Sequence, residues 1–277
     1  MRIHINCEDN PHTFNKKNYL VRASERLGLD VISGWSPGCD ADYVLNIEPY
    51  SNLGTGKIWT GAWWIDTLLD NVRFNTEFPY INTIFLAGTS HKVIPKDNHR
   101  LLFQAADTDF HKPMSVGKEC DFILAGTMGL DIYRERERCI DLLRKEGFSY
   151  IGAGKNFKGI DYGKQLNRAR VQFIRSMEVD GHGEIAQRFF ECLAIGPVLT
   201  NYVTDLKHTG LVENKDYLAY RSDEEMIEKM HWLVDDPHYA FQIAENGRYK
   251  SKLYHTYEHR LMTIIQEINE YTLLKQR

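Results

Sequence analysis

The amino-acid sequence predicts an α/β protein with two lobes, each built around a parallel β-sheet. Short apolar runs typical of buried strands alternate with stretches of helical period, first over about residues 3–86 and again from about residue 120. Strands that alternate with helices form βαβ units and therefore parallel sheets. This alternation occurs in two series, and the boundary between them lies near 105–113. We therefore expect two Rossmann-like lobes, 1–106 and 107–257.

The first series of elements begins with a strand at Ile3–Ile5 and a helix that ends at Gly28. The apolar residues of this helix recur at helical spacing, at Tyr19, Leu20, Ala23 and Leu27. The segment Trp63–Asn71 has helical character at its end. Four further strand-like runs cover 30–33, 43–47, 57–59 and 83–86.

The second series predicts helices over 133–145 and 162–169, which lie between strands at 122–125, 149–151 and 171–176. The remainder is mostly helical. Ser222, followed three residues later by Glu225, has the form of a capping box and predicts a helix start. Asp236 ends that helix and Pro237 begins another, because proline is tolerated in the first helical turn. A long last helix is expected from about 256 to 275.

Composition and charge limit the class of protein. A hydrophobic content of 43% and a charged content of 26% fit a globular protein with a core. The net charge of −4 and the lack of a long basic run give no sign of a polyanionic partner. No apolar stretch has the length of a signal peptide or a membrane span, and the five cysteines form no C-x-x-C pair. These features predict a cytoplasmic, metal-free protein with buried thiols.

The segment 171–201 holds the most informative polar pattern. A strand leads into a glycine-containing loop, Val179–Gly183, and then into an expected helix, Glu184–Ile195. Such a junction offers backbone N–H groups to an anion. A carboxylate on the helix can bind ribose hydroxyls and Arg188 can neutralise a phosphate, but an ordinary surface helix has the same pattern. The polar stripe consists of Glu184, Gln187, Arg188 and Glu191, and the opposite apolar stripe consists of Ile185, Phe189 and Cys192.

The segment Arg188–Gly196, with the sequence RFFECLAIG, resembles the R-x-F-E-x-x-A-x-G pattern of the CgeB-like glycosyltransferases, GT-B enzymes related to the family 4 group. Gln104–Pro113 resembles the segment between the lobes of these enzymes, and Asp121–Thr127 resembles the first strand of their donor lobe. Two later stretches, 217–236 and 244–260, resemble their tail. The resemblance covers about residues 100–265 in collinear order, whereas the first hundred residues match only loosely.

This resemblance implies a GT-B fold, in which two Rossmann-like lobes face each other across a cleft and the last helix, about 258–277, packs back on the first lobe. The second lobe would bind a nucleotide sugar, for which we expect a UDP-sugar, and no cofactor. Glu191 would bind the ribose, and Arg188 would face the diphosphate. Four further residues would line the donor site: Gly126 and Thr127 at the phosphates, and Gly152 and Gly154 near the base.

One position departs from the family 4 pattern. Those enzymes often carry two glutamates eight positions apart, whereas Glu184 and Glu191 are seven apart and Gly183 stands in the expected place. A sugar-contacting role for Glu184 is therefore less well supported than the ribose role of Glu191. We keep both Gly183 and Glu184 as candidate contacts of the donor.

Glycosyl transfer requires positive charge at the leaving diphosphate and an acceptor hydroxyl aligned on the anomeric carbon. Many GT-B enzymes supply that charge with arginine, lysine and backbone N–H groups in place of a metal. Arg134, Arg136 and Arg138 begin the helix that follows Gly126, and we select Arg136 as the phosphate contact. The alternative for each arginine is solvated pairing with the glutamates between them.

In the first lobe, Asp66 is the candidate that could activate the acceptor hydroxyl. A base at Asp66 would imply inversion of the sugar, whereas the family 4 relationship implies retention. Trp59, Trp63 and Trp64 precede Asp66 and are either an acceptor platform or part of the core, with Asp66 then capping a helix. Asp9 and His12 follow the first strand and are further candidates.

Other functions fit parts of the sequence. His255–His259 matches the H-x-x-E-H pattern of zinc peptidases, but no third ligand follows it. The acceptor of a transferase could be a glycan, a protein, a small molecule or, as in some phage enzymes, a DNA base, and the net charge argues against DNA. A catalytically silent module that binds a nucleotide sugar or a protein is a further alternative. So is a GT-B-shaped epimerase, for which we identify no acid/base pair.

Overall fold

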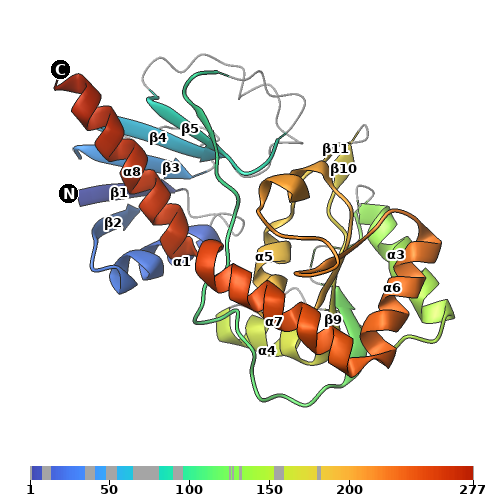
Figure 1. The fold of residues 1–277 in the computed structure, drawn as a ribbon. Coiled ribbons are helices and arrows are strands. Elements are labelled where there is room, and N and C mark those ends of the chain that lie inside the picture. The colour runs from blue at the N-terminus through green and yellow to red at the C-terminus, as the bar shows by residue number, and fades with distance from the viewer. Residues whose placement is uncertain are drawn as a thin grey trace. The chain divides into compact units, whose positions relative to one another are not determined.

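The computed structural model divides the chain into two compact units (Figure 1). Unit 1 consists of residues 1–104 and 257–277, and unit 2 consists of residues 105–256. The boundaries predicted from the sequence, after residues 106 and 257, lie close to these. The residues that the structure describes are 2–7, 14–34, 41–47, 55–64, 81–89, 96–124, 126, 128–130, 133–152, 159–179 and 182–276.

Unit 1 is built on a six-stranded parallel sheet with the strand order β2-β1-β3-β4-β5-β6. The first strand is part of the core of this unit, since its residues Ile3 and Ile5 are fully buried. Its neighbour β3 contributes Val44 and Leu45, which are also buried. The strands are β1 (Arg2–Cys7), β2 (Asp30–Gly34), β3 (Tyr43–Ile47), β4 (Trp59–Trp64), β5 (Thr83–Leu86) and β6 (His99–Leu101).

Two helices, α1 (Phe14–Arg26) and α8 (Tyr257–Lys275), pack against each other in unit 1 (Figure 1). Arg26 of α1 is hydrogen-bonded to Glu258 of α8. The buried Arg260 donates to the backbone oxygens of Phe103, at 2.6 Å, and Gln104, at 3.0 Å. Helix α8 therefore belongs to the core of unit 1, although unit 2 precedes it in the chain.

The prediction for the segment around the tryptophans was wrong in one detail. A strand was expected at 57–59, but β4 runs from Trp59 to Trp64, and the helical character expected at the end of Trp63–Asn71 lies outside the described residues. Trp63 pairs in register with Ile47 on one side and Phe85 on the other. Aromatic residues favour such buried strands. Gly61 lies between Trp59 and Trp63 in the strand, and only glycine fits there because a Cβ would overlap the ring of Trp59.

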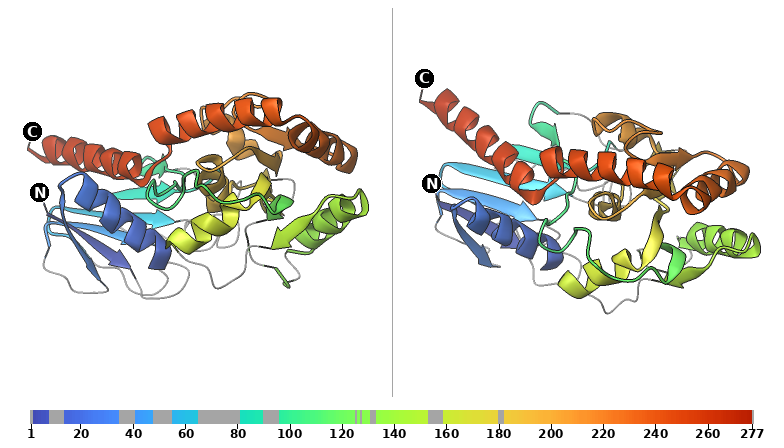
Figure 2. Two further views of the ribbon diagram at one scale, coloured as in Figure 1. Left: turned by 90° about the horizontal axis from the view of Figure 1, so that it is seen from below. Right: turned by 60° about the horizontal axis from the view of Figure 1, so that its bottom comes forward.

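Unit 2 contains a five-stranded parallel sheet with the order β13-β12-β9-β7-β8 (Figures 1 and 2). Two parallel-sheet α/β units are what the sequence predicted. A core of buried side chains joins this sheet to three helices and includes Phe122, Phe173 and Met226. The strands are β7 (Cys120–Leu124), β8 (Tyr150–Gly152), β9 (Ala169–Ile174), β12 (Val198–Asn201) and β13 (Leu218–Tyr220).

Among the helices of unit 2, α3 contacts α6, whereas α5 contacts α7. The predicted start of α6 is confirmed, because the Ser222 hydroxyl accepts a hydrogen bond from the backbone N–H of Glu225. The predicted start of α7 at Pro237 is also confirmed, and Asp236 caps it. The helices are α3 (Arg134–Lys145), α4 (Gly159–Asn167), α5 (Gln187–Leu193), α6 (Asp223–Asp235) and α7 (Pro237–Tyr254).

The helix predicted over Glu184–Ile195 is shorter than expected. A small hairpin of β10 (Glu178–Val179) and β11 (His182–Gly183) comes first, and the backbone N–H of Glu184 is bonded to the oxygen of Met177. Ala186 is still extended, so α5 begins only at Gln187. Glu184 is therefore not on the helix and cannot share a helical stripe with Glu191.

The cysteines at positions 7, 120, 139 and 192 are buried, as predicted. Within the described part of the chain, no helix is both long enough and apolar enough to cross a membrane.

Candidate functional site

Gly126 and Arg136 meet at the carboxyl end of β7. Gly126 stands two residues beyond the last residue of this strand, and a Cβ at that position would lie 2.9 Å from Nη1 of Arg136. Arg136 is the third residue of α3, and its Nε donates to the backbone oxygen of Arg175 at 3.2 Å. Because ligands of open α/β sheets bind outside the carboxyl ends of the strands, this position is favourable for a site.

Three arginines are close enough to influence one another electrostatically. Burial lowers the pKa of the Arg136 guanidinium, and the positive charges of Arg175 and Arg188 lower it further. The Arg136 guanidinium also lies 4.1 Å from the centre of the Tyr133 ring. Like charges held together in a partly buried place repel one another, and a bound anion removes that repulsion. The cluster of Arg136, Arg175 and Arg188, called here the arginine cluster, is therefore a candidate site for a phosphorylated ligand.

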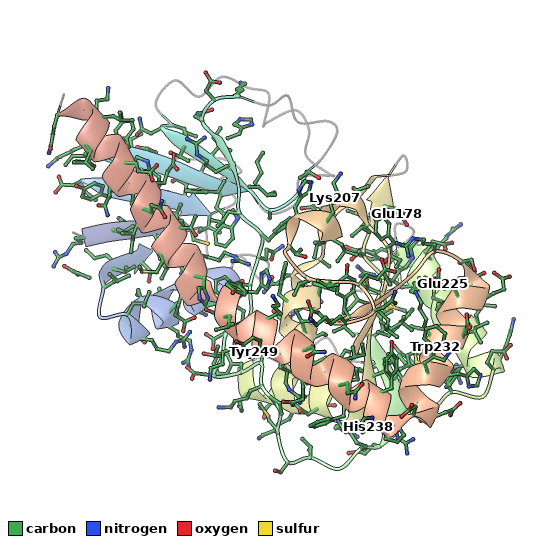
Figure 3. The ribbon with its side chains drawn as sticks, viewed as in Figure 1. Glu178, Lys207, Glu225, Trp232, His238 and Tyr249 are labelled. Atoms are coloured by element: carbon green, nitrogen blue, oxygen red, sulfur yellow. The ribbon has the colours of Figure 1, made fainter. Side chains whose placement is uncertain are left out.

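Arg175 was not predicted from the sequence as a site residue. It directly follows β9, and its Nη1 donates to the backbone oxygen of Ser176 and to Glu178, both at 2.9 Å. Glu178 lies on β10 in the hairpin that follows (Figure 3). The position of Arg175 near the carboxyl end of the strand predicted over 171–176 was the signal that could have found it.

The second part of the site is a buried carboxylate. Glu191 on α5 is inaccessible to solvent and accepts hydrogen bonds from Gln187 Nε2 and Arg188 Nη1, each at 2.7 Å. Burial favours the neutral acid, but the charge of Arg188 and the two hydrogen bonds outweigh it, so the pKa of Glu191 lies below its ordinary value. The carboxylate therefore holds the arginine, whose guanidinium lies 4.8 Å from the centre of the Tyr162 ring. Arg188 is thus fixed at one edge of the arginine cluster.

His111 lies behind this carboxylate. Its Nδ1 accepts a hydrogen bond from the backbone N–H of Asp107 at 3.0 Å, and its Nε2 lies 3.8 Å from Oε1 of Glu191. Burial lowers the pKa of His111 and outweighs the opposite effect of the two carboxylates. The ring is therefore neutral at pH 7, and because Nδ1 is the acceptor, its proton is on Nε2.

Two adjoining pockets at this end of unit 2 share Arg175 and Glu178. The smaller also includes Arg136. The larger has a volume of about 260 Å³ and continues to the ends of β12 and β13, at Asn201 and Arg221. The pockets therefore follow the carboxyl ends of three neighbouring strands.

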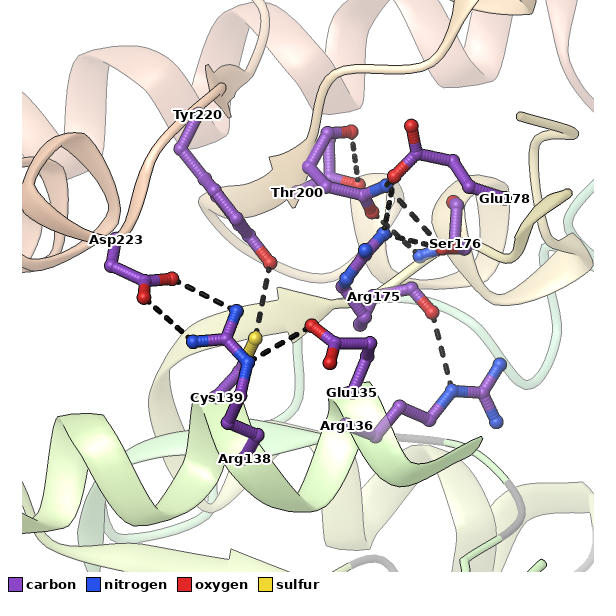
Figure 4. A network of polar contacts seen from close by, with 11 residues as sticks. Glu135, Arg136, Arg138, Cys139, Arg175, Ser176, Glu178, Thr200, Tyr220 and Asp223 are labelled. Atoms are coloured by element: carbon purple, nitrogen blue, oxygen red, sulfur yellow. Dashed lines mark hydrogen bonds and ion pairs between the residues drawn. The ribbon is translucent and has the colours of Figure 1, made fainter. Parts of the chain in front are cut away.

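Ion pairs fix the outer wall of the larger pocket (Figure 4). Arg138 of α3 donates to both oxygens of Asp223, at 2.6 and 3.0 Å, and also to Glu135 at 3.0 Å. The Tyr220 hydroxyl lies 3.8 Å from the Cys139 sulfur. Arg138 is thus engaged in joining α3 to α6, whereas Arg136 on the same helix belongs to the arginine cluster.

Three further predicted contacts in the described part of unit 2 are Gly152, Gly183 and Glu184. Gly152 ends β8 and pairs in register with Leu124. Gly183 pairs with Glu178, and a Cβ at Gly183 would overlap Val203, which explains why the residue has no side chain. Glu184 is mostly buried just before α5.

The tryptophans of β4 are core residues. Trp59 and Trp63 have no exposed surface, and their indole N–H groups donate to the Thr83 hydroxyl and to the Leu102 backbone oxygen. The hypothesis that these two rings form an acceptor platform was therefore wrong. The side chain of Trp64 is not described, and the candidates Asp66, Thr127, Gly154, Asp9 and His12 lie outside the described residues.

The H-x-x-E-H pattern is divided between the two units. His255 follows α7 at the end of unit 2, whereas His259 lies on α8 in unit 1. Over the residues that the structure describes, no three or more His, Cys, Asp or Glu side chains are grouped so that they could hold a metal ion.

The sequence profile of the glycosyl transferase-like family matches residues 108–266. The chain belongs to this glycosyl transferase-like family. The match includes the arginine cluster, Glu191 and His111, so the site described above lies within the part of the chain that defines the family. No protein of curated function matches the chain in sequence.

Solved structures of low sequence identity share the fold of this glycosyl transferase-like chain, which is GT-B. Sucrose-phosphate synthase from Thermosynechococcus elongatus has a TM-score of 0.64 at 12% identity, over 100% of both chains. Anabaena Alr3699/HepE, solved with UDP and glucose, has a TM-score of 0.67 at 8% identity, over 98% of this chain and 100% of its own. A glycosyltransferase from Rickettsia africae has a TM-score of 0.59 at 8% identity, over 98% of each chain.

Proposed function

We propose that the protein is a CgeB-like glycosyltransferase that moves a sugar from a nucleotide sugar, expected to be a UDP-sugar, to an acceptor hydroxyl. The observation that carries this proposal is the arginine cluster at the carboxyl ends of β7 and β9. Membership of the glycosyl transferase-like family supports it, as does the UDP and glucose bound to Anabaena Alr3699/HepE. In this proposal unit 2 is the donor lobe and unit 1 is the acceptor lobe. The free, buried thiols fit a reducing, cytoplasmic setting.

The arginine cluster would bind the diphosphate of the donor. Gly126 has no side chain beside the guanidinium of Arg136, and the diphosphate would lie there, between α3 and the end of β9, which Arg175 follows. When the bond between the anomeric carbon and the diphosphate oxygen breaks, its electron pair remains on that oxygen. Fixed guanidinium groups stabilise this developing charge, and they do so without a metal ion.

Glu191 would bind the ribose. A carboxylate offers about four lone-pair sites, and Gln187 and Arg188 take one each. We propose that a ribose hydroxyl takes the place of Gln187 as the donor to Oε1, because Gln187 is partly exposed whereas Arg188 is tied to both the carboxylate and the diphosphate. Gly152 and Gly154 would lie near the base, and Thr127, Gly183 and Glu184 near the phosphates and the sugar.

The acceptor oxygen forms the new bond to the anomeric carbon and loses its proton to a base, for which Asp66 is our candidate. A single displacement assisted by Asp66 inverts the anomeric centre, whereas the resemblance to family 4 favours retention. We propose retention as the first outcome to test, and inversion is the outcome expected if Asp66 acts as the base. The anomeric proton of the product in an NMR spectrum distinguishes these outcomes. Retention with an Asp66→Asn variant that keeps full activity would remove Asp66 from the chemistry.

The first test is a thermal-shift screen with UDP, GDP, dTDP, CDP and their common sugars. A ligand at about 100 times its Kd stabilises the folded state by about 2.7 kcal/mol, so binding is measurable before the acceptor is known. We expect one nucleotide series to raise the Tm of the wild type and of Asp223→Asn, and not of Glu191→Ala. Release of the free sugar from the same donor would then establish bond cleavage. A shift without cleavage or transfer would favour a silent binding module, and no shift at all would contradict the proposed donor site.

A further inference from the structure

His111 is an enclosed polar residue that the proposed reaction does not use. Its side chain has no exposed surface, and a backbone N–H donor, that of Asp107, occupies its Nδ1. Tyr162 lies edge-on to the imidazole, with 6.2 Å between the ring centres. The ring is therefore fixed in both position and tautomer, with its remaining N–H on Nε2.

That Nε2–H group faces the carboxylate of Glu191. The distance from Nε2 to Oε1 is 3.8 Å, which is longer than a hydrogen bond but short enough for a direct electrostatic contact. Oε1 is the oxygen that also accepts from Gln187, while Oε2 accepts from Arg188. His111 and Gln187 therefore converge on the same oxygen atom.

The surroundings keep the imidazole neutral. Burial lowers the pKa of His111, although the nearby carboxylates of Glu191 and Asp107 act in the opposite direction. A neutral ring contributes an N–H dipole without adding a second full positive charge beside Arg188. The carboxylate of Glu191 therefore remains negatively charged and can accept a hydrogen bond from a ligand. The imidazole contacts it from the interior side and so limits its orientation.

We infer that His111 is a positioning residue that fixes the carboxylate of Glu191 for the ribose of the nucleotide, so that discrimination between ribose and deoxyribose depends on it. This inference rests on the proposed function. When a ribose hydroxyl replaces Gln187 at Oε1, the Nε2–H dipole of the histidine remains in electrostatic contact with that oxygen from the interior side and opposes rotation of the carboxylate. Hydrogen bonds to charged groups depend strongly on alignment, so a carboxylate free to rotate selects poorly for a hydroxyl.

Two conservative variants separate the two ring nitrogens. The side-chain amide of His111→Gln reaches the place of Nε2 and can still donate to Glu191, whereas His111→Asn reaches only the place of Nδ1 and can still accept from Asp107. The affinities of UDP, 2′-deoxy-UDP and 3′-deoxy-UDP are measured by calorimetry on the full chain, with the same three forms of GDP and CDP run in parallel. We expect the wild type and His111→Gln to prefer a ribose form by roughly tenfold or more. We expect His111→Asn to lose most of this preference.

His255→Leu is the matched control, because His255 is buried in the same unit and contacts Phe190, the neighbour of Glu191. We expect it to lower Tm and leave the ribose preference unchanged. An unchanged preference in His111→Asn, or an equal loss in His255→Leu, would overturn the inference while nucleotide binding stands. If no nucleoside diphosphate binds the wild type, the proposed function fails, and the inference fails with it.

Discussion

Two arginine–carboxylate pairs in unit 2 have nearly the same length and different surroundings. Arg188 and Glu191 are 2.7 Å apart, and Arg138 and Asp223 are 2.6 Å apart. The carboxylate of Glu191 is inaccessible to solvent, whereas the side chain of Asp223 is 40% exposed. The two pairs therefore differ in the burial of the carboxylate and not in the distance between its oxygen and the arginine.

The difference indicates what each pair contributes. An exposed ion pair is weakened by water and salt and adds little to stability. A buried carboxylate is costly to desolvate, and it is retained only with several donors around it. Glu191 has such donors and lies beside the arginine cluster, which fits a ligand-binding role, whereas Asp223 serves to join α3 to α6.

The largest expected effect follows removal of the buried carboxylate. Glu191→Ala leaves Arg188 partly buried without its partner, and breaking a buried pair in this way costs about 3 kcal/mol. Urea unfolding of the unliganded protein measures this loss. Asp223→Asn is the matched control, and an equal loss in both variants would remove the distinction between the pairs.

The next effect concerns ligand affinity. Arg136→Ala removes a charged donor from the arginine cluster, so we expect the affinity for the best nucleoside diphosphate to fall roughly 10- to 100-fold. Arg138→Ala, two residues away on α3, should change it less than twofold. Titration calorimetry at fixed ionic strength compares the variants, and similar losses in both would argue that only the net charge of α3 matters.

The pH dependence of stability gives a smaller effect. Burial lowers the pKa of His111, and Arg188 with two hydrogen bonds lowers that of Glu191 against the effect of burial. In both cases the unfolded chain binds the proton more readily. The contribution of His111 is therefore present above about pH 6.5 and is lost as the pH falls below that value, whereas the contribution of Glu191 is present above about pH 4.3 and is lost only in more acidic solution. Unfolding free energies from pH 7.5 to 5.5 should decline, less steeply in His111→Gln and unchanged in slope in Asp223→Asn. A wild-type slope retained by His111→Gln would assign the decline to other histidines.

The smallest effect is expected at the exposed pair. Asp223→Asn removes the carboxylate charge that pairs with Arg138, but Glu135 continues to accept a hydrogen bond from Arg138. We expect a loss of about 0.5 kcal/mol, decreasing further in high salt. A loss of several kcal/mol in the same urea series would show that this pair is not equivalent to an ordinary surface pair.

The sequence predicted the two parallel-sheet units, because strand and helix periodicities depend on local residue order. It also predicted the starts of α6 and α7, since Ser222 and Pro237 act on the backbone next to them. It failed for the tryptophan strand, where pairing with Ile47 and Phe85 decides the structure. The prediction from the sequence was also wrong for the start of α5, because the preceding hairpin determines where this helix begins.

The candidate site was predicted only in part for the same reason. Glycine and arginine positions near strand ends pointed to Gly126 and Arg136, and the structure brings these two together. The burial of Glu191 was not predictable, because a polar stripe on a helix is ordinarily solvated. Nor were the contact of Arg136 with the backbone oxygen of Arg175 and that of His111 with Glu191, because each joins residues distant in the sequence.

Helix α8 completes unit 1 from the far side of unit 2 in the chain, and this order has a consequence for synthesis on the ribosome. Residues 1–104 leave the ribosome before β7 has been made, yet they cannot acquire their packing against Leu261, Ile264 and Ile268 until all of unit 2 has been made. Unit 2 is contiguous and can fold as soon as it emerges. The part of the molecule that is translated first is therefore the last to be finished, and a chaperone that protects nascent chains would be expected to hold the N-terminal sheet.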